Sequence, residues 1–172
     1  RTLYEEPMSD LGGGARLTPA EETDAPELFA LVDRNRERLR EWLPWADDTL
    51  EPEDTLRFLR AMRTSAADLQ FCLKVEGRIT GCVGLHGISR THGVASIGYW
   101  ITGELEGRGL VSNAVAAVVR HAFENLGLHR VEIRCAVENA RSRAIPLRLG
   151  FRQEGILREA ERAKGHRLDI AL

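Results

Sequence analysis

The chain has 172 residues, 43% of them hydrophobic, which suits one domain with its own core. A formal net charge of -2 gives no general attraction to nucleic acid or to acidic membranes, so we expect neither as a partner. No apolar stretch is long enough to span a bilayer and no signal-like segment opens the chain, which indicates a cytoplasmic protein. The three cysteines stand singly without metal-ligand spacing, so we expect neither a disulfide nor a metal site.

The first half of the chain predicts helices and then a hairpin. Residues 1–14 are polar and rich in glycine, so we expect a flexible N-terminal segment ahead of one domain over residues 15–172. Residues 15–18 are a short candidate strand, and apolar residues at helical spacing predict helices over 25–39 and 52–64. Between these helices, Trp42 and Trp45 lie in a predicted loop, where such a pair packs at a core edge or forms the wall of a binding site.

From Leu69 the hydrophobic period changes to two. The alternation predicts a hairpin over residues 69–86 that turns at Glu76-Gly77, and a third strand over 94–101. The remainder predicts an amphipathic helix over 111–126 that ends at Gly127, a strand over 131–137, a short helix from 140 or 142 to 149, and an extended segment from 151 with a turn at 164–165. This order indicates an α+β fold with a mixed, mostly antiparallel sheet and helices on both faces.

The loop before the long helix contains Gly107 and Gly109. Glycines let the backbone turn sharply and approach a ligand, and the first helical turn supplies N–H donors with no partner inside the helix. Because a helix N-terminus also carries partial positive charge, the loop predicts an anion site suited to a phosphate or pyrophosphate. A plain strand-to-helix turn explains the same residues. The P-loop and the dinucleotide-binding motif are excluded, because Gly-Lys-Ser/Thr is absent and Ser112 occupies the place of the third glycine.

From about Leu17 to Leu172 the chain resembles the GNAT superfamily of acyl-CoA N-acyltransferases, and within it the RimJ/RimL-like group that acetylates protein N-termini. The resemblance rests on several motifs, in chain order Trp42-Leu43-Pro44-Trp45, Gly98-Tyr99-Trp100, Glu106-Gly107-Arg108-Gly109, Glu138-Asn139 with Ser142, Leu149-Gly150-Phe151 and Glu154-Gly155. It implies a single-domain GNAT-like fold, acetyl-CoA as co-substrate, no metal, and an acceptor amine that is a peptide N-terminus or a small amine. A homodimer is compatible with it.

The resemblance also implies roles for individual residues. Ser142 would serve the departing thiolate and Glu161 would act as a base. The coenzyme A site would comprise Trp100, Ile101, Gly107, Arg108, Gly109, Leu110, Val111, Ser112 and Asn139, and the acceptor site Trp42, Trp45 and His86. Each role has a structural alternative: a helix cap for Ser142, a turn residue for Asn139, a solvated charged face for Glu161 and a partly buried structural histidine for His86.

We therefore expect an acetyl-CoA-dependent N-acetyltransferase in which the amine attacks the thioester directly. Acetylation of a small amine, such as an antibiotic, polyamine or amino acid, is the nearest alternative. A regulatory acyl-CoA-binding module without turnover is another, because Glu104 stands where the superfamily has Gln or Arg. A Rossmann-type nucleotide-binding domain ranks last, because hairpins rather than helical crossovers precede the loop.

Overall fold

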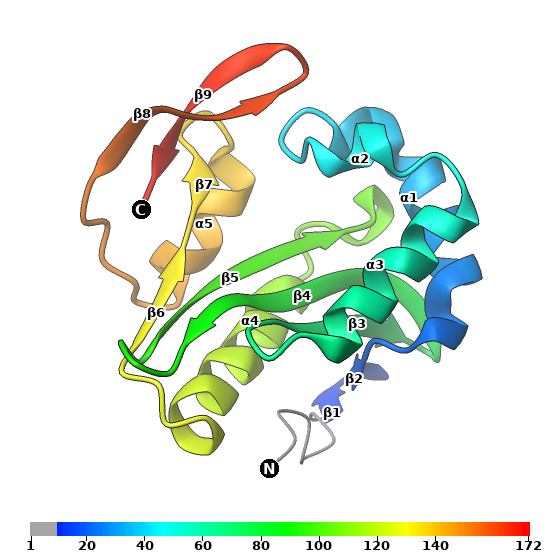
Figure 1. Ribbon diagram of the computed structural model, residues 1–172, viewed down its shortest axis with the longest axis horizontal. Helices are drawn as coiled ribbons and strands as arrows, with labels where there is room; N and C mark the ends of the chain where they lie inside the picture. The colour runs from blue at the N-terminus through cyan, green and yellow to red at the C-terminus, as the bar shows by residue number, and fades with distance from the viewer. Residues whose placement is uncertain (1–9) are drawn as a thin grey trace.

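The computed structural model describes residues 10–172, and within them the strands form two sheets (Figure 1). The order of strands is β1-β2-β3-β4-β5-β6 in the larger sheet and β7-β9-β8 in the smaller one. The larger sheet consists of β1 (Asp10–Gly12), β2 (Ala15–Pro19), β3 (Leu69–Val75), β4 (Arg78–Ser89), β5 (Val94–Ile101) and β6 (Arg130–Ile133). The smaller sheet consists of β7 (Cys135–Ala136), β8 (Ile156–Ala163) and β9 (His166–Ala171).

The helices agree closely with the hydrophobic periodicity. They are α1 (Ala25–Leu39), α2 (Trp45–Asp48), α3 (Pro52–Thr64), α4 (Leu110–Arg120) and α5 (Ala140–Arg148). Helix α4 continues as a π-helical turn over His121–Asn125, and Gly127 follows with a positive φ of 65°. The predictions for α1 and α3 are confirmed, whereas Trp45 begins the short helix α2 instead of lying in a loop.

The larger sheet is mixed, as predicted. Adjacent strands from β1 to β5 are antiparallel, and β5 and β6 are parallel. Helix α4 covers one face of this sheet, and α1 and α3 cover the other (Figure 1). Helix α4 forms the crossover between β5 and β6. Two parallel strands need such a crossover, because the chain must return to the same end of the sheet before the second strand begins. The predicted arrangement with helices on both faces is therefore confirmed.

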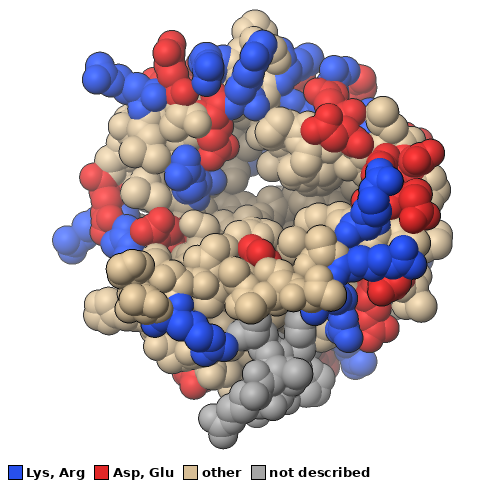
Figure 2. Space-filling model, in the orientation of Figure 1, with Lys and Arg blue, Asp and Glu red and all other residues tan. Residues whose placement is uncertain are grey.

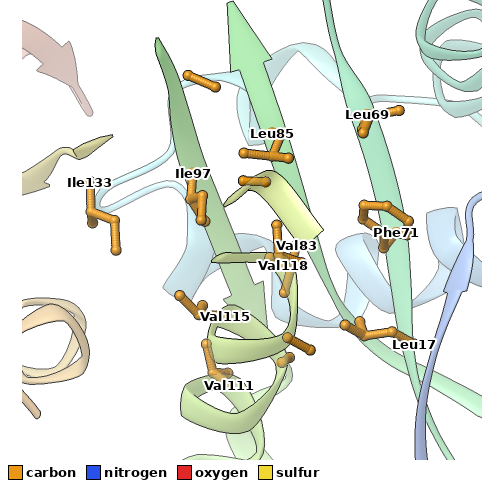
Figure 3. Close-up of a cluster of buried hydrophobic side chains, with 14 of the residues drawn as sticks. Leu17, Leu69, Phe71, Val83, Leu85, Ile97, Val111, Val115, Val118 and Ile133 are labelled. Atoms are coloured by element: carbon orange, nitrogen blue, oxygen red, sulfur yellow. The ribbon is translucent and has the colours of Figure 1, made fainter. Parts of the chain in front are cut away.

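The core is built from alternate residues of the central strands. Leu69, Phe71 and Leu73 of β3 belong to one buried cluster with residues of β4, β5 and α4. In Figure 3, Val115 and Val118 of α4 lie beside Ile97 of β5 and Val83 of β4. The residues of β3 between those in the cluster face the opposite way, so Cys72 packs with the side chains of α1 and α3. Both faces of β3 are buried, which explains why its first five residues are buried without interruption.

Phe71 is the largest fully buried side chain, with 1% of its surface exposed. We expect Phe71→Ala to lower the free energy of unfolding by about 3–5 kcal/mol, because the removed ring leaves a cavity in a close-packed core. Phe123→Ala is the matched control, since that ring is 44% exposed. Urea unfolding of both variants measures the difference, and equal losses would contradict this description of the core.

Three boundaries differ from the sequence predictions. The strand predicted over residues 131–137 is divided at Arg134, because β6 pairs with β5 while β7 pairs with β9. The strand predicted from Phe151 begins at Ile156. Asp10–Gly12 pair with β2, although residues 1–14 were expected to be flexible; residues 1–9 of that segment lie outside the described residues. Within residues 10–172, no helix is both long enough and apolar enough to cross a membrane.

Candidate active site

The site is a cavity that opens where two parallel strands diverge. Strands β5 and β6 are paired only between Val94–Ile97 and Arg130–Ile133. Beyond this point β5 continues to Ile101, whereas the chain after β6 enters β7 and the other sheet (Figure 1). A cavity of about 630 Å³ lies between the diverging strands, and Figure 2 shows the surface hollowed there. Among the described residues, the edge of β5 from Gly98 to Ile101 has no strand partner on this side. The Ile101 carbonyl accepts from Arg38, and the other backbone groups of this edge can bind an extended, amide-bearing ligand.

The predicted glycine loop forms one end of this cavity. Gly107 and Gly109 have φ values of 76° and 75°, and a Cβ atom at either would meet nothing within 4 Å. Gly109 is the N-cap of α4, so the N–H groups that follow it lack partners in the helix. All nine residues predicted for the coenzyme A site line the cavity: Trp100, Ile101, Gly107, Arg108, Gly109, Leu110, Val111, Ser112 and Asn139.

The charges that line the cavity are mainly positive. Five arginines and two glutamates contribute to its walls: Arg38, Arg108, Arg134, Arg141, Arg148, Glu106 and Glu161. The Glu106 carboxylate is shared by two of these arginines, with Arg38 of α1 at 2.5 Å from one oxygen and Arg141 of α5 on the other. Arg148 donates to the Ser112 hydroxyl at 3.0 Å. Glu104 does not line the cavity, so the acid that replaces the superfamily's Gln or Arg lies off the anion site.

Ser142 lies in a cluster of three polar side chains from different elements. Its hydroxyl oxygen is 3.3 Å from the Tyr99 hydroxyl of β5 and 3.3 Å from the Cys135 sulfur of β7. The Asn139 side chain caps α5, because its oxygen accepts from the Ser142 N–H at 3.2 Å. Burial, followed by the neighbouring Cys135, raises the pKa of Tyr99, so the phenol stays protonated at neutral pH. The cluster therefore places a serine hydroxyl at the cavity wall, in contact with a phenol and a thiol.

Another part of the cavity wall comes from the turn between α1 and α2 and from strand β8. Trp42 and Glu161 line the cavity there, and Glu161 accepts from Arg134 at 3.2 Å. Lys164, in the hairpin turn, forms an ion pair with Glu41, which immediately precedes Trp42. This contact joins the second sheet to the turn between α1 and α2.

Two residues predicted for the acceptor site lie elsewhere. Trp45 does not line the cavity but packs on Trp100, with ring centroids 5.9 Å apart and planes inclined at 52°. His86 is also absent from the lining, and its Nδ1 lies 3.5 Å from an Asp68 oxygen. The physical reason is register: His86 pairs with Ser96, within the part of β5 that β6 still covers.

Several lining residues had no role in the sequence prediction: Arg38, Tyr99, Arg134, Cys135, Arg141 and Arg148. The position of Tyr99 at the cavity could have been predicted from the alternation of side chains along a strand, because Tyr99 lies two residues before Ile101 and on the same face. The arginines carry no local signal, since they come from elements that meet only in the fold. Within residues 10–172, no group of three or more His, Cys, Asp or Glu residues could hold a metal ion.

Curated relatives of the chain are acetyltransferases. It is 37% identical over 155 residues to the putative ribosomal N-acetyltransferase YdaF of Bacillus subtilis, with 87% of this chain and 84% of the relative covered. It is 29% identical over 143 residues to the ribosomal-protein-serine acetyltransferase of Escherichia coli, with 81% and 80% covered.

Solved structures share the fold. The microcin C7 self-immunity acetyltransferase MccE, in complex with acetyl-CoA and AMP, superposes with a TM-score of 0.88 at 25% identity, covering 96% of this chain and 93% of that one. The ribosomal L7/L12 acetyltransferase RimL, in complex with coenzyme A, has a TM-score of 0.91 at 24% identity, covering 95% and 94%, and shows the fold. Residues 15–152 match the acetyltransferase (GNAT) domain. The chain thus belongs to the GNAT acetyltransferase family, whose members transfer an acetyl group from acetyl-CoA to an amine.

Proposed function

We propose that this enzyme acetylates the α-amino group at the N-terminus of a protein or peptide. The observation that carries the proposal is the single carboxylate at the acceptor end of the cavity, Glu161, which is held by Arg134 at 3.2 Å. Carboxylates are weak bases, and an α-amine needs only a weak one. The curated relatives named as ribosomal-protein acetyltransferases support the same class of acceptor.

We propose that acetyl-CoA lies along the cavity, with its pyrophosphate at the Gly107–Ser112 loop. The N–H groups at the start of α4 and the arginines of the lining suit the phosphate charges. The unpaired edge of β5 suits the amides of the pantetheine arm. This path leads the thioester toward Ser142 and leaves the Glu161 end for the amine.

In the proposed reaction, the neutral amine attacks the thioester carbonyl, forming the C–N bond before the C–S bond breaks. Coenzyme A leaves as a thiolate, to which the Ser142 hydroxyl donates a hydrogen bond. The proton lost by the attacking nitrogen passes to Glu161 or through it to water. No covalent enzyme intermediate is needed.

The proton on the amine decides between classes of acceptor. An α-amine has a pKa of about 7.7 and lysine about 10.4, so at pH 7 about a sixth of α-amines but only about 0.04% of lysines are neutral. An enzyme with a strong buried base could offset this difference. Glu161 is half-exposed and paired with an arginine. We therefore propose that the low pKa of the acceptor amine, and not the base of the enzyme, provides most of the neutral form.

We predict faster transfer to an N-terminal amine than to lysine. Matched peptides with one free N-terminus or one free lysine should differ by at least about 100-fold in kcat/KM at pH 7. Glu161→Gln should slow transfer to the preferred peptide most at pH 6, where the amine is mostly protonated, and least at pH 9. Mass spectrometry of the peptides gives the rates.

Glu159→Gln is the matched control, because Glu159 lies on the same strand and does not line the cavity. Faster transfer to the lysine peptide would overturn the N-terminal proposal. A Glu161→Gln enzyme with full activity from pH 6 to pH 9 would remove Glu161 as the base.

A small amine is the second candidate acceptor. The ion pair between Glu41 and Lys164 ties the β8–β9 turn to the residue before Trp42, which lines the cavity, and the similar structure of MccE comes from a microcin self-immunity acetyltransferase. Polyamines, amino acids and an aminoglycoside offered in the same assay test this candidate. A free amine that exceeds the best peptide in kcat/KM would favour it.

A further inference from the structure

A proline inside α5 leaves one backbone carbonyl of the active site without its helical partner. Pro146 lies four residues after Ser142, and it has no N–H with which to close the helical bond to the Ser142 carbonyl. The Tyr99 hydroxyl from β5 fills this place and donates to that carbonyl oxygen at 2.8 Å. Because a carbonyl can only accept, the single proton of the phenol is committed to it.

This commitment fixes the direction of the hydrogen bond between Tyr99 and Ser142. The Tyr99 oxygen can now act only as an acceptor, so at 3.3 Å it receives the Ser142 hydroxyl proton. The Cys135 sulfur lies 3.3 Å from the Ser142 oxygen and 3.6 Å from the Tyr99 oxygen, so its thiol can donate to either. The two directed bonds run from the Ser142 hydroxyl to Tyr99 and from Tyr99 back to the Ser142 carbonyl.

We infer that Tyr99 is a positioning residue, whose oxygen orients the Ser142 hydroxyl for the coenzyme A sulfur and whose own proton is not given to that sulfur. The inference rests on the proposed function, in which the Ser142 hydroxyl contacts the leaving thiolate. A neutral phenol oxygen is a weak acceptor, and a thiolate is a charged and stronger one. As the C–S bond breaks, the Ser142 hydroxyl moves its hydrogen bond from the Tyr99 oxygen to the thiolate. The Tyr99 proton stays on the phenol oxygen throughout, in its hydrogen bond to the Ser142 carbonyl.

Tyr99 is therefore distinguished from a general acid, although its phenol lines the cavity. A general acid would lose its proton in each turnover and would act without Ser142. A positioning residue acts only through Ser142, so its removal does not lower kcat further once the Ser142 hydroxyl is absent. This difference can be measured.

The test is a double-mutant cycle on kcat with Tyr99→Phe and Ser142→Ala, using acetyl-CoA and the preferred peptide. We expect Tyr99→Phe to lower kcat by about tenfold to a hundredfold, with the KM for acetyl-CoA nearly unchanged. The double variant should be no slower than Ser142→Ala alone. Additive losses would overturn the inference and make Tyr99 an independent donor, and so would a Tyr99→Phe enzyme of wild-type kcat.

Kinetics of the single and double variants distinguish a failure of the proposed role of Ser142 from a failure of the positioning role of Tyr99. If Ser142→Ala leaves kcat unchanged, the role of Ser142 in the proposed function is wrong, and the positioning role of Tyr99 is wrong with it. If Ser142→Ala is slow but the cycle is additive, the proposed function stands and only the inference about Tyr99 is overturned.

Tyr99→Phe could also act by leaving the Ser142 carbonyl without a partner. Pro146→Ala supplies the N–H that a regular helix directs at that carbonyl, so Tyr99→Phe/Pro146→Ala should recover stability to urea while its kcat stays low. Recovery of wild-type kcat together with stability would overturn the inference. Ser96→Ala, which removes a hydroxyl from the same strand outside the cavity, controls for loss of a polar group from β5.

Discussion

Ser142→Ala is expected to lower kcat by about 100-fold while changing the Kd of acetyl-CoA by less than about twofold. The hydroxyl matters when negative charge develops on the sulfur, which happens only as the C–S bond breaks. The bound thioester carries no such charge, so the ground state loses little. The helix that holds Ser142 should remain intact, because Asn139 caps it through the backbone N–H of residue 142, which alanine retains.

Steady-state kinetics and calorimetry with acetyl-CoA separate the two quantities, and urea unfolding checks the stability of the variant. An unchanged kcat would leave Ser142 as a structural residue of the first turn of α5. A rise in Kd as large as the fall in kcat would mean that the hydroxyl binds the co-substrate and does not act on the leaving group.

Gly109→Leu is expected to raise the Kd of acetyl-CoA by at least about 100-fold. The new side chain would enter open space at the start of α4 and keep the phosphates from the N–H groups there. Losing two charge-assisted hydrogen bonds of about 1.5 kcal/mol each corresponds to this factor. The positive φ of 75° also adds strain, which by itself would lower stability.

Gly127→Leu is the control that separates binding from strain. Gly127 lies beyond the other end of the same helical segment, has a φ of 65°, and also has nothing within 4 Å of a built Cβ. Both variants should lose similar stability, but only Gly109→Leu should lose affinity in calorimetry. Equal affinities for acetyl-CoA in the two variants would show that the anion site lies elsewhere.

The sequence predicts the elements that are determined locally. Helix α3 begins at Pro52 and has a capping box formed by Glu51 and Asp54, and its apolar residues recur at helical spacing, so its bounds can be predicted from neighbouring residues. The glycine loop is local in the same sense. The division at Arg134 is not, because the alternation over residues 131–137 is that of a single strand and the change of pairing partner is a tertiary event.

The candidate site shows the same limit. Ser142 and Asn139 lie in one motif of the sequence, and the structure places both at the cavity. Tyr99 lies 43 residues before Ser142, so their contact depends on how β5 and α5 pack. Pro146 is the one local sign of that contact, since it leaves the Ser142 carbonyl in need of a donor. The resemblance implies an acceptor role for His86, and its absence from the cavity lining depends on where β6 stops pairing with β5, which the sequence does not tell.

The single residue between β6 and β7 has a consequence for the order of events in catalysis. The cavity walls belong to two sheets, so no ladder of backbone hydrogen bonds fixes their separation. Side-chain contacts hold it instead, among them Arg141 on Glu106, Tyr99 on the Ser142 carbonyl and Lys164 on Glu41. A ligand that touches both walls restricts their relative motion. The second ligand to bind then loses less conformational entropy in ordering the walls. Each substrate should therefore tighten the binding of the other, by the same factor in both directions.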